Sequence, residues 1–105
     1  MMLRFPIDTK EFIRVARVRA TDNGVVVDPS LTIVKAAFLN VETTHPSAGD
    51  WKTASWEADG DIYFVRCLVG TAGDFVPSAT VYWPWVKIDG SPELVIRQLD
   101  PIEFY

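Results

Sequence analysis

The amino-acid sequence predicts an all-β fold, a single β-sandwich of about six to seven antiparallel strands, on three observations. Runs rich in Val, Ile, Phe, Tyr, Trp and Thr are separated at short intervals by clusters of Gly, Pro, Asn, Asp and Ser. Several runs alternate between two faces with the period of two that a β-strand requires. The length of 105 residues allows one domain, spanning residues 1–105, with one core.

Six segments carry the strand pattern. They lie at about residues 10–19, 31–42, 51–57, 61–69, 79–88 and 93–104, with boundaries good to a few residues. Asn23-Gly24 and Asp59-Gly60 tolerate the positive φ angles of tight turns between antiparallel strands. The stretch from Thr32 to Asn40 contains alanines, but its period of two favours a strand over a helix. No internal repeat or linker divides the chain.

The alternation predicts which side chains share a face of the sheet. In the segment 31–42, one face carries Val34, Ala36 and Phe38, and the other carries Ile33, Lys35, Ala37, Leu39 and Val41. In the segment 61–69, Tyr63, Val65, Cys67 and Val69 oppose Ile62, Phe64, Arg66 and Leu68. We expect the face that contains Arg66 to be the more hydrated one, because arginine is seldom buried.

Pro84 interrupts the apolar run 79–88. Proline has no backbone N–H to donate to a sheet ladder, and it is therefore confined to edge strands and bulges. The sequence accordingly predicts that this strand lies at an edge of its sheet or is bulged at Pro84.

The net charge of −4 and the pI of about 4.8 argue against a nucleic-acid partner, because a polyanion would be repelled. Arg14, Arg17 and Arg19 lie close together, but strict alternation would place Arg14 on the opposite face from the other two, and we expect all three to be solvated. No apolar run approaches the ~20 residues that span a bilayer. The first residues lack the pattern of a signal peptide, so we expect a soluble protein that the general secretory route does not export.

The residues that carry chemistry are scarce, and the sequence predicts neither an enzyme nor a cofactor. His45 is the one histidine and lies in a loop of Pro, Ser and Gly, without a nucleophile motif beside it. Cys67 is the one cysteine, which rules out an intrachain disulfide and fits a reducing cytosol; we expect its thiol to be buried as a small apolar group. One histidine and one cysteine do not make a zinc site.

Calcium is the remaining metal to consider. Asp59 and Asp61, together with Asp50 and Asp74 in other loops, could offer oxygen ligands. The spacing of a calcium-binding loop is absent, and aspartate is common in turns because its side chain bonds to nearby backbone groups. We therefore predict no metal, with calcium left as the alternative.

Four tryptophans in so short a chain are the strongest functional signal. Trp51 and Trp56 tend towards opposite faces of a strand, whereas Trp83 and Trp85 share a face unless Pro84 disrupts the pleat. Such rings either fill the core and its ends or form an exposed patch for another protein or a carbohydrate.

The order of motifs along nearly the whole chain resembles small immunoglobulin-like proteins from the virions of tailed bacteriophages, especially those that infect actinobacteria. The matching segments are Phe5–Phe12, Ala20–Pro29, Ala36–Leu39, Gly49–Glu57, Leu68–Gly70 and Tyr82–Glu93, with Pro84 as a departure from the pattern. A looser likeness exists to the N-terminal sandwich domains of phage baseplate proteins.

The resemblance implies a sandwich of the immunoglobulin or fibronectin type III kind and a non-enzymatic structural protein of the virion, assembled in the bacterial host cytoplasm. A capsid accessory or decoration subunit that binds the major capsid protein is the first expectation, with copies of itself in a symmetric assembly and with neither nucleic acid nor membrane as a partner. A neck, tail or baseplate component and a free-standing module that binds carbohydrate or a host protein are the alternatives.

Aromatic residues near the termini and around Pro84 are the candidate contacts with a partner. They are Phe5, Tyr82, Trp83, Trp85, Phe104 and Tyr105. Large apolar groups at chain ends suit a docking surface, although pairing of the two ends within the domain's own sheet explains them equally well.

Overall fold

The structure is a computed structural model that describes residues 2–18, 20–22, 25–27, 32–60, 62–89 and 94–105, with the backbone alone at 20–22 and 25–27. The prediction of an all-β chain is confirmed, since the described residues contain no α-helix and only one three-residue 3-10 helix, η1 (Ala48–Asp50). The strands are β1 (Leu3–Phe5), β2 (Glu11–Val18), β3 (Ala20–Asp22), β4 (Val25–Val27), β5 (Ile33–Leu39), β6 (Lys52–Thr53), β7 (Ser55–Asp59), β8 (Ile62–Val69), β9 (Val81–Asp89), β10 (Leu94–Gln98) and β11 (Ile102–Phe104).

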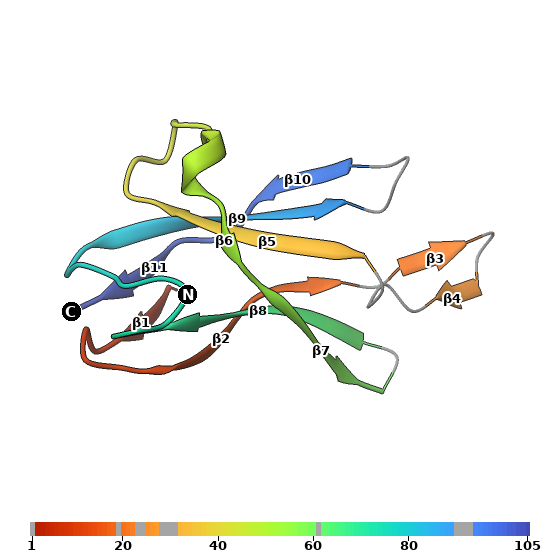
Figure 1. The fold of residues 1–105 in the computed structure, drawn as a ribbon, viewed down its shortest axis with the longest axis horizontal. Coiled ribbons are helices and arrows are strands. Elements are labelled where there is room, and N and C mark those ends of the chain that lie inside the picture. Colours follow the sequence, from red (N-terminus) through yellow and green to blue (C-terminus); the bar gives the residue numbers. More distant parts are fainter. Residues whose placement is uncertain (1, 19, 23–24, 28–31, 61, 90–93) are drawn as a thin grey trace.

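Two sheets pack face to face as in a sandwich (Figure 1). The large sheet has the order β1-β11-β9-β5-β6, with β10 also paired to β9, and the small sheet has the order β2-β8-β7. The chain crosses from the large sheet to the small one at Ala54, between β6 and β7. Strands β3 and β4 pair with each other as a separate hairpin.

All six predicted segments contain strands, but the ends of the chain differ from the prediction. The segment 93–104 forms two strands rather than one. β10 pairs with β9, and β11 pairs with both β9 and β1. The β1–β11 pair is parallel, whereas the sequence predicted antiparallel strands throughout. The two termini therefore lie side by side in one sheet, which is the second of the two explanations for their apolar residues.

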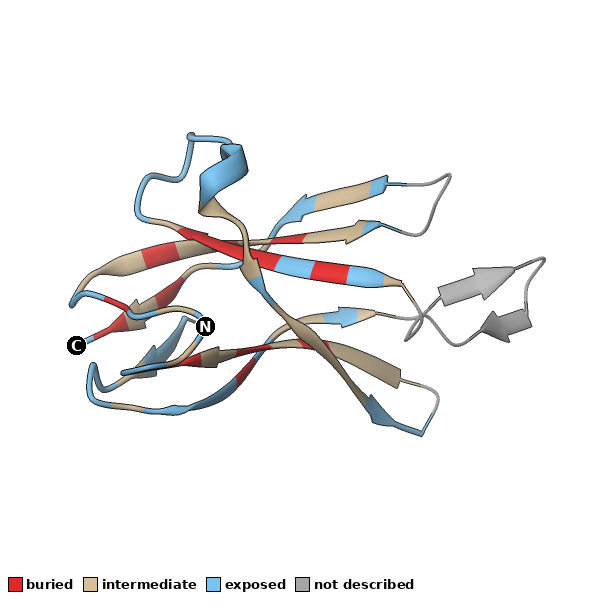
Figure 2. Cartoon of the chain, viewed as in Figure 1, coloured by how far each residue is buried: buried red, intermediate tan, exposed pale blue. Residues whose placement is uncertain are grey.

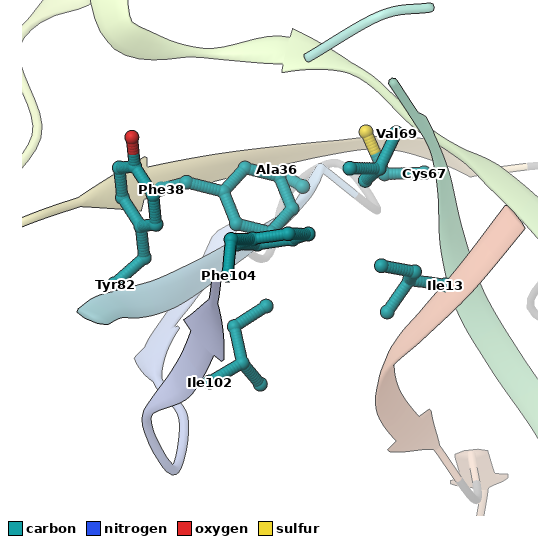
Figure 3. Packing of buried hydrophobic residues seen from close by; sticks show 8 residues of the cluster. All are labelled: Ile13, Ala36, Phe38, Cys67, Val69, Tyr82, Ile102 and Phe104. Atoms are coloured by element: carbon teal, nitrogen blue, oxygen red, sulfur yellow. The ribbon is translucent and has the colours of Figure 1, made fainter. Parts of the chain in front are cut away.

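The predicted faces of the two central strands are confirmed, and their inward residues make the core (Figure 2). The large sheet contributes Ala36, Phe38, Tyr82, Ile102 and Phe104, and the small sheet contributes Ile13, Cys67 and Val69 (Figure 3). Val34, Val65 and Val86 form a second buried cluster between the same sheets. The outward face of β8, which includes Arg66, is only half-buried.

One aromatic residue from a loop completes this core. Phe75 lies between β8 and β9 in sequence, and its ring stacks on Phe38 with a centroid distance of 4.3 Å. Its edge contacts are with Tyr82 at 5.1 Å and Phe104 at 6.4 Å. Rings at these distances attract one another beyond the area that they bury. The loop that carries Phe75 thus closes the core at one end of the sandwich.

Pro84 lies in the interior of the large sheet, so the prediction of an edge strand is wrong. Its strand β9 pairs with β5 on one side and with β10 and β11 on the other. The carbonyl of Pro84 accepts a hydrogen bond from the Leu99 N–H at 2.8 Å. The nitrogen of Pro84, which has no hydrogen to donate, faces the same neighbouring chain, because both backbone groups of a residue point to one side in an antiparallel pair. There the neighbouring chain bulges, with Asp100 and Pro101 opposite the single residue Trp83. The bulge lies in the partner of Pro84, not in β9 itself.

A second irregularity corrects the predicted placement of the arginines. The pairing of β2 with β8 shifts between Arg14 and Ala16, so Val15 is a bulge residue. Arg14 then pairs with Arg66 and Arg17 with Phe64, and both lie on the outer face of the small sheet. Strict alternation would have separated them. Arg19 lies outside the described residues.

Gly70 gives a test of the packing at the closed end of the sandwich. Its φ of +126° is one that residues with a side chain rarely adopt. A Cβ atom at this position would also lie only 2.3 Å from the Thr9 carbonyl oxygen, so the position requires glycine. We expect Gly70→Ala to lower the free energy of unfolding by about 2 kcal/mol or more, measured by urea denaturation. The control is Gly49→Ala, because Gly49 has open space around it. Equal stability of the two variants would contradict this account.

Cys67 gives a test of the core. Burial raises the pKa of its thiol to about 12 from 9.0, with a further increase from the nearby Asp74 carboxylate. The thiol thus stays protonated in the folded state at pH values where the unfolded chain releases its proton. We expect no reaction with a thiol reagent at pH 8 until denaturant is added, and a loss of stability as the pH rises above about 9. Fast labelling of the native protein would show that the site opens.

Candidate protein interface

Two of the predicted contact residues belong to the domain's own core. Tyr82 and Phe104 have exposed fractions of only 8% and 1%, and their rings contact each other. The Tyr82 hydroxyl accepts a hydrogen bond from the Ser78 N–H at 2.9 Å. Strand alternation directs both side chains between the sheets, so the prediction that they meet a partner is corrected.

The predicted contacts at the chain ends are divided between the interior and the surface. Phe5 is half-buried and lies 5.9 Å from the ring of Phe104. Tyr105 remains 54% exposed, with the Arg4 guanidinium 4.7 Å from its ring. Arg4 also forms an ion pair with Glu103 at 2.6 Å. These ends form a paired edge of the large sheet, and Tyr105 is the exposed member of the predicted set.

Trp83 and Trp85 share the outer face of the large sheet, but the chain itself covers part of that face. Both residues are half-buried. The ring of His45 meets Trp85 edge-on at 4.9 Å, and the Glu42 carbonyl accepts a hydrogen bond from the Gln98 side chain at 2.6 Å. The indole nitrogen of Trp85 is buried and has no hydrogen-bond partner within the described residues. Segment 42–51 therefore contacts Trp85, one of the two tryptophans of this face that the sequence assigned to a partner.

The other two tryptophans are also engaged within the chain. Trp56 packs against the cluster around Val65, and its indole N–H donates to the Thr32 carbonyl at 3.1 Å. The Trp51 ring lies 4.5 Å from the ammonium group of Lys87. The four indoles consequently do not form one exposed platform on which a sugar ring could stack.

The outer face of the small sheet is different, because no other layer of the described chain covers it. We name it the aromatic–arginine face and define it by Phe12, Arg14, Glu57, Phe64 and Arg66. The guanidinium of Arg14 lies 4.1 Å from the Phe64 ring, and that of Arg66 lies 4.2 Å from the Phe12 ring. Phe12 keeps 47% of its surface exposed. Strand pairing places these rings and cations next to one another on a single surface.

One carboxylate orders the two arginines of this face. Glu57 forms ion pairs with Arg14 and, at 3.5 Å, with Arg66. The Arg66 Nε donates to the Ser55 hydroxyl at 3.1 Å. The side chains are partly exposed, so the ion pairs add little to stability, but they fix where the guanidinium groups lie. The face thus presents ordered, partly desolvated cations over aromatic rings.

The sequence predicted only some of the residues that share this face. Alternation in the segment 61–69 put Phe64 and Arg66 together on the wetter face, as observed. Adding Arg14 required knowledge of the bulge at Val15, which no residue pattern in the strand announces. The tryptophans directed the prediction to the large sheet instead.

A groove opens between the two sheets beside β2. It has a volume of about 240 Å³. Its apolar lining residues include Leu3, Ile13, Ala16, Pro84, Leu99 and Ile102, with Arg14, Arg17 and Asp100 as its charged residues. We name this feature the edge groove. It is smaller than the pockets that usually hold drug-sized ligands, and it suits a single large side chain.

The groups considered for metal chemistry do not come together. In the ranges that the structure describes, no three residues among His, Cys, Asp and Glu form a cluster that could hold a metal ion. The Asp50 carboxylate instead accepts a hydrogen bond from the Ser47 N–H at 2.8 Å, where it caps η1. Asp61 lies outside the described residues. His45 is on the surface, with its Nδ1 3.1 Å from the Pro46 carbonyl.

Two further findings concern the chain as a whole. No helix in its described part is long and apolar enough to cross a membrane. The chain matches no protein-family model, no curated protein and no solved structure.

Proposed function

We propose that this protein is a non-enzymatic structural component of a tailed-phage particle, a capsid accessory or decoration subunit that binds the major capsid protein. The observation that carries a protein-binding role is the aromatic–arginine face. Aromatic residues and arginine are the types enriched where proteins meet, and they dominate the energy of such contacts. The resemblance of the sequence to small immunoglobulin-like virion proteins supplies the particle as the setting.

The arrangement of this face favours a macromolecular partner over a small ligand. An outer sheet surface offers contact area without an enclosing cleft, and the Phe64 and Phe12 rings lie against the guanidinium groups of Arg14 and Arg66. A binding face that is already ordered loses little conformational entropy on association. The carbohydrate alternative has less support, because the Trp56 indole bonds to the Thr32 carbonyl and the His45 ring packs against Trp85.

Deletion of the gene tests the setting. Imaging of the resulting particles should show filled heads that lack a regular outer density. Unjoined heads and tails would place the protein in the neck instead, and particles identical to wild type would reject a role in the virion.

The face itself is tested by Phe12→Glu, which puts a carboxylate on the exposed aromatic patch. We expect co-sedimentation of the added protein with particles from the deletion strain to fall at least tenfold, because the loss of one interface hot spot costs about 2 kcal/mol. The matched control is Ile33→Glu on the outer face of the large sheet, where Ile33 is 65% exposed. Unchanged co-sedimentation of the Phe12 variant, with its circular dichroism intact, would contradict the assignment of the face.

A further inference from the structure

Strand β2 is an edge with free backbone groups. It is the longest edge strand of the described sheets, with eight residues, against five in β7 and β10 and three in β1. Its backbone makes no hydrogen bond to another backbone in the described part of the chain outside the ladder with β8. A strand edge in this state is a template for one more strand.

The edge groove runs alongside this free edge. Ile13 and Ala16 of β2 line it from the small sheet, and Leu99 and Ile102 line it from the large sheet. A strand added to β2 would point every second side chain between the sheets, towards these apolar residues. Free backbone groups that supply affinity, next to a pocket that selects side chains, are the two components of recognition by strand addition.

The charges beside the groove indicate which side chains the added strand would carry on its outward face. Its other side chains would lie on the outer face, next to Arg14 and Arg17. Arg14 is paired with Glu57, whereas Arg17 is exposed and has no ion pair among the described residues. Opposite charges directly across two strands stabilise the pair and like charges destabilise it. An acidic side chain is therefore favoured at the outward positions.

The same arginines disfavour a second copy of this chain as the added strand. Two β2 edges placed side by side would bring two arginine-bearing rows together on one face. Charged residues are one of the devices by which edge strands avoid joining copies of themselves. They leave the edge open to a strand of the opposite charge.

We propose that β2 and the edge groove form a strand-addition site for an extended segment of a partner protein in which apolar and acidic residues alternate. One apolar side chain occupies the groove, and an acidic side chain pairs with Arg17. The inference rests on the proposed protein-binding function and names the chemistry of the partner segment. It concerns the free backbone edge of β2 and the edge groove, whereas the co-sedimentation experiment examines Phe12, on the outer face of the same strand.

The test uses an eight-residue peptide with blocked ends in which Val and Glu alternate. Titration into the ¹⁵N-labelled full chain should shift the amide resonances of β2 and of Leu99, Asp100 and Ile102. A peptide of alternating Val and Lys should bind more weakly, because its ammonium groups meet Arg17. Absence of binding by the Val–Glu peptide, or equal affinity for the two peptides, would overturn the proposal.

Two further peptides separate strand addition from simple side-chain contact. One carries N-methyl groups on all of its Val residues and the other on all of its Glu residues, so each blocks one edge of the extended peptide. Because only one edge can bond to β2, one of the two should lose binding and the other should retain it. Retention by both would refute addition to the edge.

Variants of the protein complete the experiment. Arg17→Glu should weaken the Val–Glu peptide by about two- to fivefold and strengthen the Val–Lys peptide. Arg97→Glu, the same charge change on the exposed edge strand β10, is the matched control and should leave both affinities unchanged. Leu3→Asp should weaken both peptides, since Leu3 is 53% exposed and lines the groove. If any variant that keeps the wild-type NMR spectrum does not show the expected change in peptide affinity, the result argues against the site.

The outcome is distinguishable from that of the proposed function. A protein that binds no peptide but still co-sediments with particles would reject the strand-addition site alone. A protein that binds the Val–Glu peptide but has no place on particles would reject the virion role alone.

Discussion

A single missing backbone donor, at Pro84, shapes the large sheet. β9 is central and pairs with three other strands, so the absent N–H cannot face solvent as it would at an edge. It faces Leu99 instead, and the chain bulges there through Asp100 and Pro101. The bulge ends β10 and begins β11 one residue out of register. β11 then pairs with β1 on its other side, so the two ends of the chain join directly after this break.

The two bulges of the fold act together. One lies at Val15 in the small sheet and the other at Asp100–Pro101 in the large sheet, and the edge groove is lined by residues of both. The irregular pairing leaves an opening to the core beside the longest free edge. Bulges next to binding sites are common because they redirect side chains without loss of the surrounding ladder.

The sequence predicted what depends on period and composition, and it missed what depends on partners distant in the chain. The faces of β5 and β8 follow from alternation alone, because each strand has one buried and one wetter side. The parallel pairing of β1 with β11 involves residues about a hundred positions apart, and neither strand is long enough to carry a pattern. Pro84 indicated an irregularity correctly, but only the pairing could place the bulge in the opposite strand. The tryptophans did not decide between the two roles, because large rings are favoured both in cores and at interfaces.

The aromatic residues are divided between the core and the surface of the small sheet. Phe38, Phe75, Tyr82 and Phe104 form one connected set of rings, which leaves Phe12 and Phe64 outside. Bare phenyl rings on an open sheet would invite non-specific association. Here each ring lies beneath a guanidinium group, so water meets a charged group at this surface. A partner that displaces the water, or pairs with the arginine, can use the apolar area of the ring. The acidic partner segment that we propose would therefore depend on these local cations, because the net charge of the chain as a whole is −4.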